Sequence, residues 1–168
     1  TLNPDHSYTK VVFDPWQQTS WDVNDTLLLD PRFDVDVLSL AKNYFDSLPA
    51  QWGTWYDINI NSADIRKTEA AQKTVPHNST PNICELDVLG RVFITTNNNG
   101  ALGNYSTIID LDIEGNDIKI TDPKGIEAFI HITDLSGRKI LIESKDAGMK
   151  SLLPDVAGKP IYLWDANG

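Results

Sequence analysis

The residues that most often carry acid–base, nucleophilic or metal chemistry are scarce in this chain. Its three histidines, His6, His77 and His131, are widely separated, and Cys84 is its single cysteine. They can form neither a Cys/His metal cluster nor an internal disulfide, and no serine lies in a nucleophile-elbow motif. His131 falls on the less apolar face of a strand-like stretch, residues 128–133, where we expect an exposed or hydrogen-bonded sheet histidine. The sequence therefore predicts no catalytic residue, no metal site and no cofactor, and we expect a protein that is not an enzyme.

Acidic side chains gather early in the chain, at Asp25, Asp30, Asp34 and Asp36. The cluster lacks the Gly and the terminal Glu of a calcium loop. Asp30 precedes Pro31, and an Asp that caps a helix followed by Pro at the first helical position is a helix-start signal. We therefore interpret the cluster as a helix N-terminus, where the helix dipole favours negative charge.

The second half of the chain carries a phrase of structural rather than chemical meaning, repeated four times. It reads Asp-x-x-Gly, with a second Gly ten or eleven residues after the first. The copies are Asp87 to Gly90, Asp112 to Gly115, Asp134 to Gly137 and Asp155 to Gly158, and the second glycines are Gly100, Gly125, Gly148 and Gly168. A period of this length indicates stacked or winding units that cannot bury their apolar faces alone.

The chemistry of a tight turn explains both residue types. An Asp side chain accepts hydrogen bonds from nearby backbone N–H groups, and Gly supplies the positive φ that closes a hairpin. Arg91, Arg138 and Lys159 follow the first Gly in three copies and Asn116 in the other, and we expect the basic side chains to pair with a carboxylate of the adjacent copy. The eight Asp and Gly residues are therefore predicted to be structural turn residues of an antiparallel ribbon.

Composition excludes some classes of partner. The net charge is −10 and the pI is about 4.5, which disfavours nucleic acid and anionic membranes because both are bound by clustered Lys and Arg. No stretch of about 18 apolar residues is present. Hydrophobic residues make up 40% of the chain, enough for a folded core.

The pattern of apolar residues divides the chain into three expected parts. Residues 1–29 are predicted to form N-terminal strands, at 8–13 and 17–29. Residues 30–82 are predicted to be a helical insertion with an aromatic loop, in which one helix begins at the Asp30 cap and ends before Pro49, residues 51–56 are a connection, and a weaker helix spans 62–73 with Asn61 or Ser62 as its cap. Residues 83–168 are predicted to be the four β repeats. Aromatic side chains are expected to pack the helix onto the sheet, and this packing set is Phe13, Trp16, Trp21, Trp55 and Tyr56.

The repeats resemble the YD (Rhs) repeat, whose core is Tyr-Asp-x-x-Gly-Arg, although Leu86, Leu111, Thr133 and Pro154 replace the Tyr. Further segments look like the repeat-containing part of the B component of insecticidal toxin complexes, the Tc toxins. These segments are residues 10–18, 21–26, 30–32, 54–56, 155–160 and 164–165. The resemblance covers nearly the whole chain, and both ends look cut from a longer polypeptide.

This resemblance implies a fold and a function. The fold would be mainly β, an antiparallel YD/Rhs-repeat sheet that forms a segment of a β-cocoon shell, with a two-helix insertion. The chain would be a structural wall of a secreted toxin complex, and its partners would be the remainder of the B component, a C component and the toxin cargo. The family's relatives can cleave themselves near an Asp-Pro-x-Gly motif, but Asp122-Pro123-Lys124-Gly125 falls at an ordinary repeat turn, where we expect no cleavage.

Two other classes of function stay open. A secreted glycan-binding β-module would use exposed tryptophans in a groove, and an enzyme would need a pocket with convergent polar groups. Open strand edges also allow the chain to associate with itself.

Overall fold

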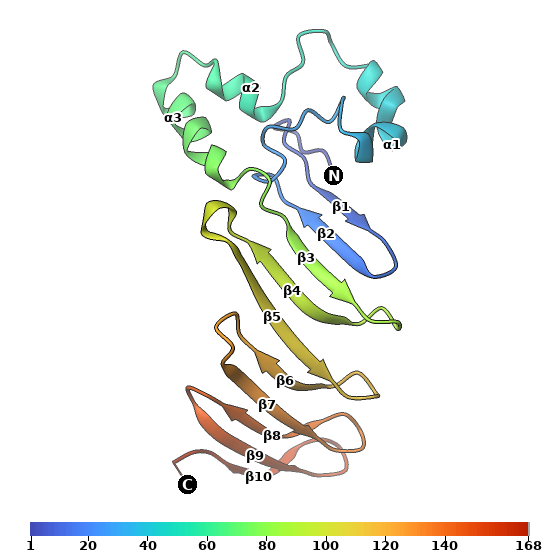
Figure 1. Cartoon of the computed structure of the whole chain (residues 1–168), viewed down its shortest axis with the longest axis vertical. Coiled ribbons are helices and arrows are strands. Elements are labelled where there is room, and N and C mark those ends of the chain that lie inside the picture. Colours follow the sequence, from blue (N-terminus) through green and yellow to red (C-terminus); the bar gives the residue numbers. More distant parts are fainter. Residues whose placement is uncertain (168) are drawn as a thin grey trace. The chain divides into compact units, whose positions relative to one another are not determined.

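The computed structural model describes residues 1–167, apart from the side chains of Leu40 and Ala41, so the expected turn residue Gly168 lies outside the described residues. Ten strands follow one another in chain order in a single sheet, and helical segments lie between β2 and β3 (Figure 1). The strands are β1 (Lys10–Phe13), β2 (Gln17–Trp21), β3 (Asn82–Leu86), β4 (Val92–Asn98), β5 (Asn104–Leu111), β6 (Asp117–Thr121), β7 (Glu127–Thr133), β8 (Lys139–Ser144), β9 (Gly148–Pro154) and β10 (Pro160–Trp164). The helices are α1 (Val35–Asp46), α2 (Trp55–Ile60) and α3 (Ile65–Thr74), with short 3-10 segments η1 (Val75–His77) and η2 (Gly100–Leu102). The predicted mainly β, antiparallel fold is confirmed.

The chain divides into two compact units. The first comprises residues 1–83 and 97–104, and it holds β1, β2 and all three α-helices. The second comprises residues 84–96 and 105–167 of the described chain, and it holds β6 to β10 with every Asp-x-x-Gly turn.

The expected insertion contains three α-helices, because the aromatic stretch expected to be a connection includes one of its own. Thr54 caps α2, and its side chain and that of Asp57 each accept the other's backbone N–H in a capping box, which is a local signal that the sequence analysis missed. The cap of α3 is Asp64 rather than the expected Asn61 or Ser62.

The predicted helix cap at Asp30 is wrong. Helix α1 begins later, and its cap is Asp34, whose side chain accepts the backbone N–H of Asp36. Asp30 instead accepts the backbone N–H of Arg32 at 2.9 Å and the Arg32 guanidinium at 2.6 Å. The nearby guanidinium holds Asp30 in a turn of its own, so the helix starts at the next acidic residue.

Strand positions follow the prediction closely in the repeats and less well elsewhere. Strands β4 to β10 all lie within residues 83–168, the part predicted to be β repeats. The predicted extended stretch 17–29 ends at Trp21, because Asp22 Oδ1 accepts the backbone N–H groups of Asn24 (2.7 Å) and Asp25 (2.9 Å) and folds the chain into turns.

The hydrophobic core is small and lies in the first unit. Its buried apolar side chains are Tyr8, Leu27, Pro31, Phe45 and Ala71. In β7 of the second unit His131 is 7% exposed while Ile132 is 51% exposed, so of the two expected states, exposed or hydrogen-bonded, the histidine is not in the exposed one. The Nδ1 atom of His131 lies 3.2 Å from the carbonyl oxygen of Asp117, and this hydrogen bond satisfies the buried ring.

Candidate functional site

The four Asp-x-x-Gly phrases form turns of one geometry, all in the second unit. In each turn the Gly N–H donates to the carbonyl of the Asp three residues earlier, at 2.9–3.1 Å. The Asp N–H donates to the carbonyl four residues later, at 2.8–3.0 Å. The turns connect β3 to β4, β5 to β6, β7 to β8 and β9 to β10, which places them at the same end of successive hairpins (Figure 1).

The Asp side chain completes each turn. Its Oδ1 accepts the backbone N–H four residues later in all four turns, at 2.8–3.0 Å. In the first three it also accepts the N–H two residues later, at 2.8 Å. In these turns the Asp side chain therefore accepts the backbone N–H groups of the turn, and the Gly N–H closes it.

The second carboxylate oxygen binds the side chain that follows the Gly. Asp87 Oδ2 accepts Arg91 Nε at 2.7 Å, Asp112 Oδ2 accepts Asn116 Nδ2 at 2.8 Å, and Asp134 Oδ2 accepts Arg138 Nε at 2.7 Å. The backbone N–H of Arg91 and then its guanidinium hold the pKa of Asp87 below its ordinary value, and Arg138 does the same for Asp134. The Asn116 amide and its backbone N–H lower the pKa of Asp112.

The same side chains reach the next turn along the sheet. Arg91 Nη1 donates to the carbonyls of Asp112 and Ile113, each at 3.3 Å, and Arg138 Nη1 donates to the carbonyl of Asp155 at 3.2 Å. The expected pairing with a carboxylate of the adjacent copy is therefore wrong. The carboxylate four residues earlier in the same hairpin is closer, so the neighbouring turn offers its backbone carbonyls instead.

The glycines leave room for these links. A Cβ at Gly115 would lie 3.1 Å from Arg91 Cδ, and a Cβ at Gly137 would lie 3.0 Å from Asn116 Oδ1. At Gly90, by contrast, a Cβ would meet nothing within 4 Å. All four turn glycines have positive φ, between 75° and 96°. We name this row of four turns the turn ladder.

A fifth turn of this geometry lies at the opposite end of the hairpins. Asp122 Oδ1 accepts the backbone N–H groups of Lys124 and Ile126, each at 2.8 Å, and Gly125 N–H donates to the carbonyl of Asp122 at 3.0 Å. The sequence signal was present, because Asp122 to Gly125 has the same spacing as the four copies.

The first residue after each ladder Asp is a large aliphatic side chain that points into solvent. Val88 is 80% exposed, Ile113 is 93%, and Leu135 and Val156 are fully exposed. We call these four side chains the apex residues. The sheet of the second unit buries few of its apolar side chains within the described residues.

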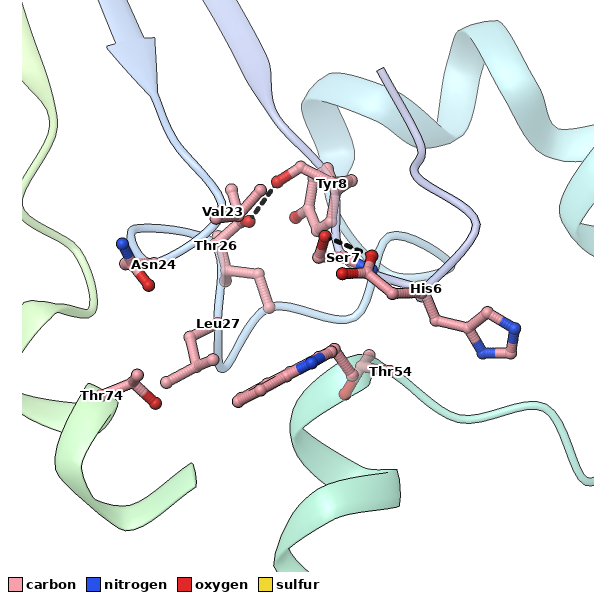
Figure 2. A pocket seen from close by; sticks show the side chains of 12 residues that line it. His6, Ser7, Tyr8, Val23, Asn24, Thr26, Leu27, Thr54 and Thr74 are labelled. Atoms are coloured by element: carbon pink, nitrogen blue, oxygen red, sulfur yellow. Dashed lines mark hydrogen bonds between the residues drawn. The ribbon is translucent and has the colours of Figure 1, made fainter. Parts of the chain in front are cut away.

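The expected packing set is divided by the structure. Phe13 and Trp16 are 76% and 58% exposed, so they do not pack a helix onto the sheet, since the tip of the β1–β2 hairpin extends away from the helices (Figure 1). Trp21, Trp55 and Tyr56 are half-buried. Trp55 lines a cavity of about 240 Å³ in the first unit, to which Leu27 and Thr54 also contribute (Figure 2).

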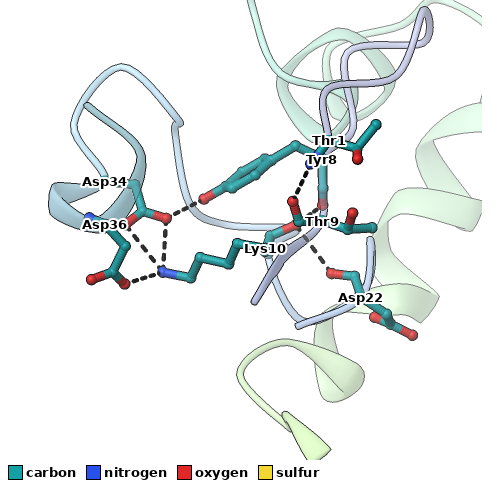
Figure 3. Close-up of polar contacts among 8 residues, drawn as sticks. Thr1, Tyr8, Thr9, Lys10, Asp22, Asp34 and Asp36 are labelled. Carbon is teal, nitrogen blue, oxygen red and sulfur yellow. Dashed lines mark hydrogen bonds and ion pairs between the residues drawn. The ribbon is translucent and has the colours of Figure 1, made fainter. Parts of the chain in front are cut away.

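A buried ionic cluster joins β1 to the start of α1 in the first unit (Figure 3). Lys10 Nζ lies 2.8 Å from Asp34 Oδ2 and 2.7 Å from Asp36 Oδ2, and the Tyr8 hydroxyl donates to Asp34 Oδ2 at 2.7 Å. The Lys10 ammonium also lies 4.8 Å from the centre of the Trp21 ring. No local pattern in the sequence indicates this cluster, because its partners are about 25 residues apart in the chain.

Hydrogen bonding decides the charges in this cluster. Burial opposes ionisation of Asp34, but the bonds from Lys10 and Tyr8 outweigh it and hold the pKa of Asp34 below its ordinary value. Burial likewise opposes the charge on Lys10, yet its bonds to Asp34 and Asp36 raise its pKa. Burial and then the bond to Asp34 raise the pKa of the Tyr8 hydroxyl.

Comparison with known proteins gives a structural match along almost the whole chain. A mutant Tc holotoxin pore of Photorhabdus luminescens matches 98% of this chain at 20% identity with a TM-score of 0.65. Crystal structures of TcdB2-TccC3 and of TcdB2-TccC3-Cdc42 each match 96% at 20% identity with a TM-score of 0.63. This chain has the fold of a Tc toxin segment.

The chain spans only 6–7% of the length of these solved Tc toxin chains. No protein-family profile matches it, and no curated protein matches it. The resemblance to Tc toxins drawn from the residues is therefore confirmed through the fold, while activity and partners of the whole complexes do not follow from it.

Two further properties of the described residues concern metal binding and membrane crossing. Among residues 1–167 no group of three or more His, Cys, Asp or Glu side chains is placed to hold a metal ion. No helix in the described part of the chain has the length and apolar character needed to cross a membrane.

Proposed function

We propose that the chain is a wall segment of a Tc-type shell that encloses a toxic cargo for delivery, with no chemistry of its own. The observation that carries the proposal is the shared fold with Tc toxin complexes over 96–98% of the chain. The partners would be the remainder of a toxin B component, a C component and the enclosed toxin, and the assembly would be secreted.

The turn ladder supports a mechanical role. Arg91 and Arg138 each bind a carboxylate in their own hairpin and a carbonyl in the next, so the first hairpin is fastened to the second, and the third to the fourth, at their ends as well as along their strands. A sheet with few buried apolar residues depends on such links, because strand pairing alone leaves the hairpin ends free to separate. This arrangement suits a wall better than a catalytic cleft.

The glycan-binding alternative has weaker support. It needs tryptophans exposed together in a groove, and the exposed tryptophans of the described chain, Trp16 and Trp164, belong to different units.

The open reading frame that encodes the chain gives a first test. We expect further Asp-x-x-Gly repeats after the segment and the other regions of a B component before it. A signal peptide directly before Thr1 with a stop codon after residue 168 would contradict the proposal and favour a free-standing secreted module.

A functional test replaces the matching segment of TcdB2 with this chain and co-produces it with TccC3. If the chain is a wall, the cargo inside the assembled shell stays intact under added protease. A matched chimera carrying Gly115→Val and Gly137→Val should leak, because it breaks two ladder turns. Digestion of the cargo in a chimera that assembles normally by electron microscopy would refute the wall function.

A further inference from the structure

The cavity of the first unit has the size and the lining of a small-molecule pocket. Its volume is about 240 Å³, and its apolar walls come from Val23, Leu27, Leu29 and Trp55 (Figure 2). An apolar cavity of about 150 Å³ is enough to hold benzene. The pocket therefore has room for a two-ring aromatic molecule.

Most polar groups of the lining are already bonded within the protein. The hydroxyls of Ser7 and Thr54 each bond an aspartate, Asp5 at 2.6 Å and Asp57 at 2.8 Å. The hydroxyls of Thr26 and Thr74 donate to backbone carbonyls at 2.6 and 2.9 Å. These hydroxyls are therefore not available to a ligand without breaking an existing bond.

The side chains of Asp5 and Asn24 in the lining keep polar atoms that are open to a ligand. Asp5 Oδ1 accepts both the N–H and the hydroxyl of Ser7, whereas its Oδ2 has no hydrogen bond to another described residue. The side-chain amide of Asn24 likewise has no hydrogen-bond partner among residues 1–167. The bonds from Ser7 keep the pKa of Asp5 below its ordinary value, so the carboxylate is an anion at neutral pH.

The segment that carries Asp5 is fixed rather than loose. His6 has a positive φ of 67°, which is rare for a residue with a side chain. Its Nδ1 lies 2.8 Å from the carbonyl oxygen of Gly53, its ring stacks on Trp52 with centroids 5.0 Å apart, and its carbonyl accepts the N–H of Trp55 at 3.3 Å. These contacts tie the residue after Asp5 to the start of α2, and Asp5 and Trp55 line the same pocket.

We propose that this pocket binds a small aromatic molecule with a protonated amine, its ring against Trp55 and Leu27 and its ammonium group paired with Asp5. An aromatic ring matches the apolar walls, and an ammonium group matches the open carboxylate oxygen. This binding activity is separate from the shell function and does not depend on it.

Titration of the 168-residue chain with tryptamine tests the proposal. Backbone amide shifts measured by ¹H–¹⁵N NMR should saturate and be largest at the pocket residues Ser7, Asn24 and Leu27. Asp5 is exposed, so Asp5→Asn should weaken tryptamine binding about twofold to fivefold, the range for an ion pair at an exposed site, and should leave the binding of neutral indole unchanged. Asp46→Asn is the matched control, because it removes an exposed carboxylate of α1 that does not line the pocket, and it should change neither ligand.

A second variant keeps the test decisive if Asp5→Asn alters the fold. Val23→Phe places a ring inside the cavity and should abolish the binding of both tryptamine and indole while the NMR spectrum stays that of a folded chain. Shifts that do not saturate, or binding that is equally strong in Val23→Phe, would overturn the proposal.

Discussion

Glycine meets two separate demands in the turn ladder. Positive φ is required at every turn glycine, and this conformation costs about 1–2 kcal/mol for a residue with a Cβ. At Gly115 and Gly137 a Cβ would also press on the side chain arriving from the preceding turn, on Arg91 Cδ and on Asn116 Oδ1. At Gly90 only the positive φ requires glycine, because the space around it is open.

The two separate reasons for glycine at these positions, positive φ and lack of space for a Cβ, give the first prediction. Gly90→Ala should lower the free energy of unfolding by about 1 kcal/mol. Gly137→Ala should lower it by about 1 kcal/mol more, since the added methyl displaces Asn116. Urea unfolding followed by circular dichroism measures both. Equal losses of unfolding free energy in the two variants would show that the positive φ alone explains why glycine is needed.

A second prediction concerns the buried ammonium group of Lys10. The Lys10 and Asp34 side chains are 9% and 4% exposed. Lys10→Met leaves the Asp34 carboxylate buried without its cation and should lower the free energy of unfolding by about 3 kcal/mol. Lys42→Met is the control, because the Lys42–Asp46 pair is 63% and 58% exposed and should contribute less than about 0.5 kcal/mol. Similar losses of unfolding free energy in the two variants would mean that the buried cluster stabilises the fold no more than an exposed ion pair does.

At the scale of elements, the sequence predicted those features whose causes lie within a few residues. The ladder turns could be predicted, because Asp and Gly at a spacing of three carry the whole hydrogen-bond pattern of the turn. The start of α1 was misplaced because Arg32 binds Asp30 and leaves Asp34 as the cap. The Tyr8–Asp34 bond and the links from one turn to the next join residues far apart in the chain, and no local pattern encodes them.

The third prediction concerns the turn aspartates and the loss of fold stability in acid. Asp87, Asp112 and Asp134 have a lowered pKa in the folded chain because N–H donors hold their carboxylates. A carboxyl whose pKa is lower when folded stabilises the fold above its unfolded pKa of about 3.9, and that contribution is lost as the pH falls through the folded pKa. The urea midpoint of unfolding should therefore fall as the pH is lowered below about 4.

The matched variant isolates one turn from the other carboxylates. Asp112→Asn keeps an oxygen acceptor but cannot titrate, so its urea midpoint should fall less between about pH 5 and about pH 3. Asp146→Asn, at an exposed position in the same unit, should behave as the unchanged protein. An identical fall in Asp112→Asn would exclude the turn as a source of the acid sensitivity.

At the scale of the whole molecule, the balance between buried and exposed apolar residues is unusual. The buried apolar side chains belong to the first unit, while apolar side chains of the second unit are exposed on β5, β6, β7, β9 and β10. A free globular domain seldom exposes so many large apolar side chains. The cohesion of the second unit must therefore come largely from strand pairing and from the turn ladder, whose bonds do not require a core.

The apex residues test this view of the molecule. Replacing Val88, Ile113, Leu135 and Val156 together with Ser should leave the free energy of unfolding within about 1 kcal/mol of the starting value, because side chains that are already in water lose no burial. The same variant should bind less of a dye that reports exposed apolar surface, and it should associate less at high concentration. Ile120→Ser is the control, since Ile120 is half-buried opposite Ile109 in the β5–β6 pair and should cost at least about 1 kcal/mol. A loss in the apex variant as large as the control's would mean that the turns bury their apices in solution, and that the second unit is held by a core after all.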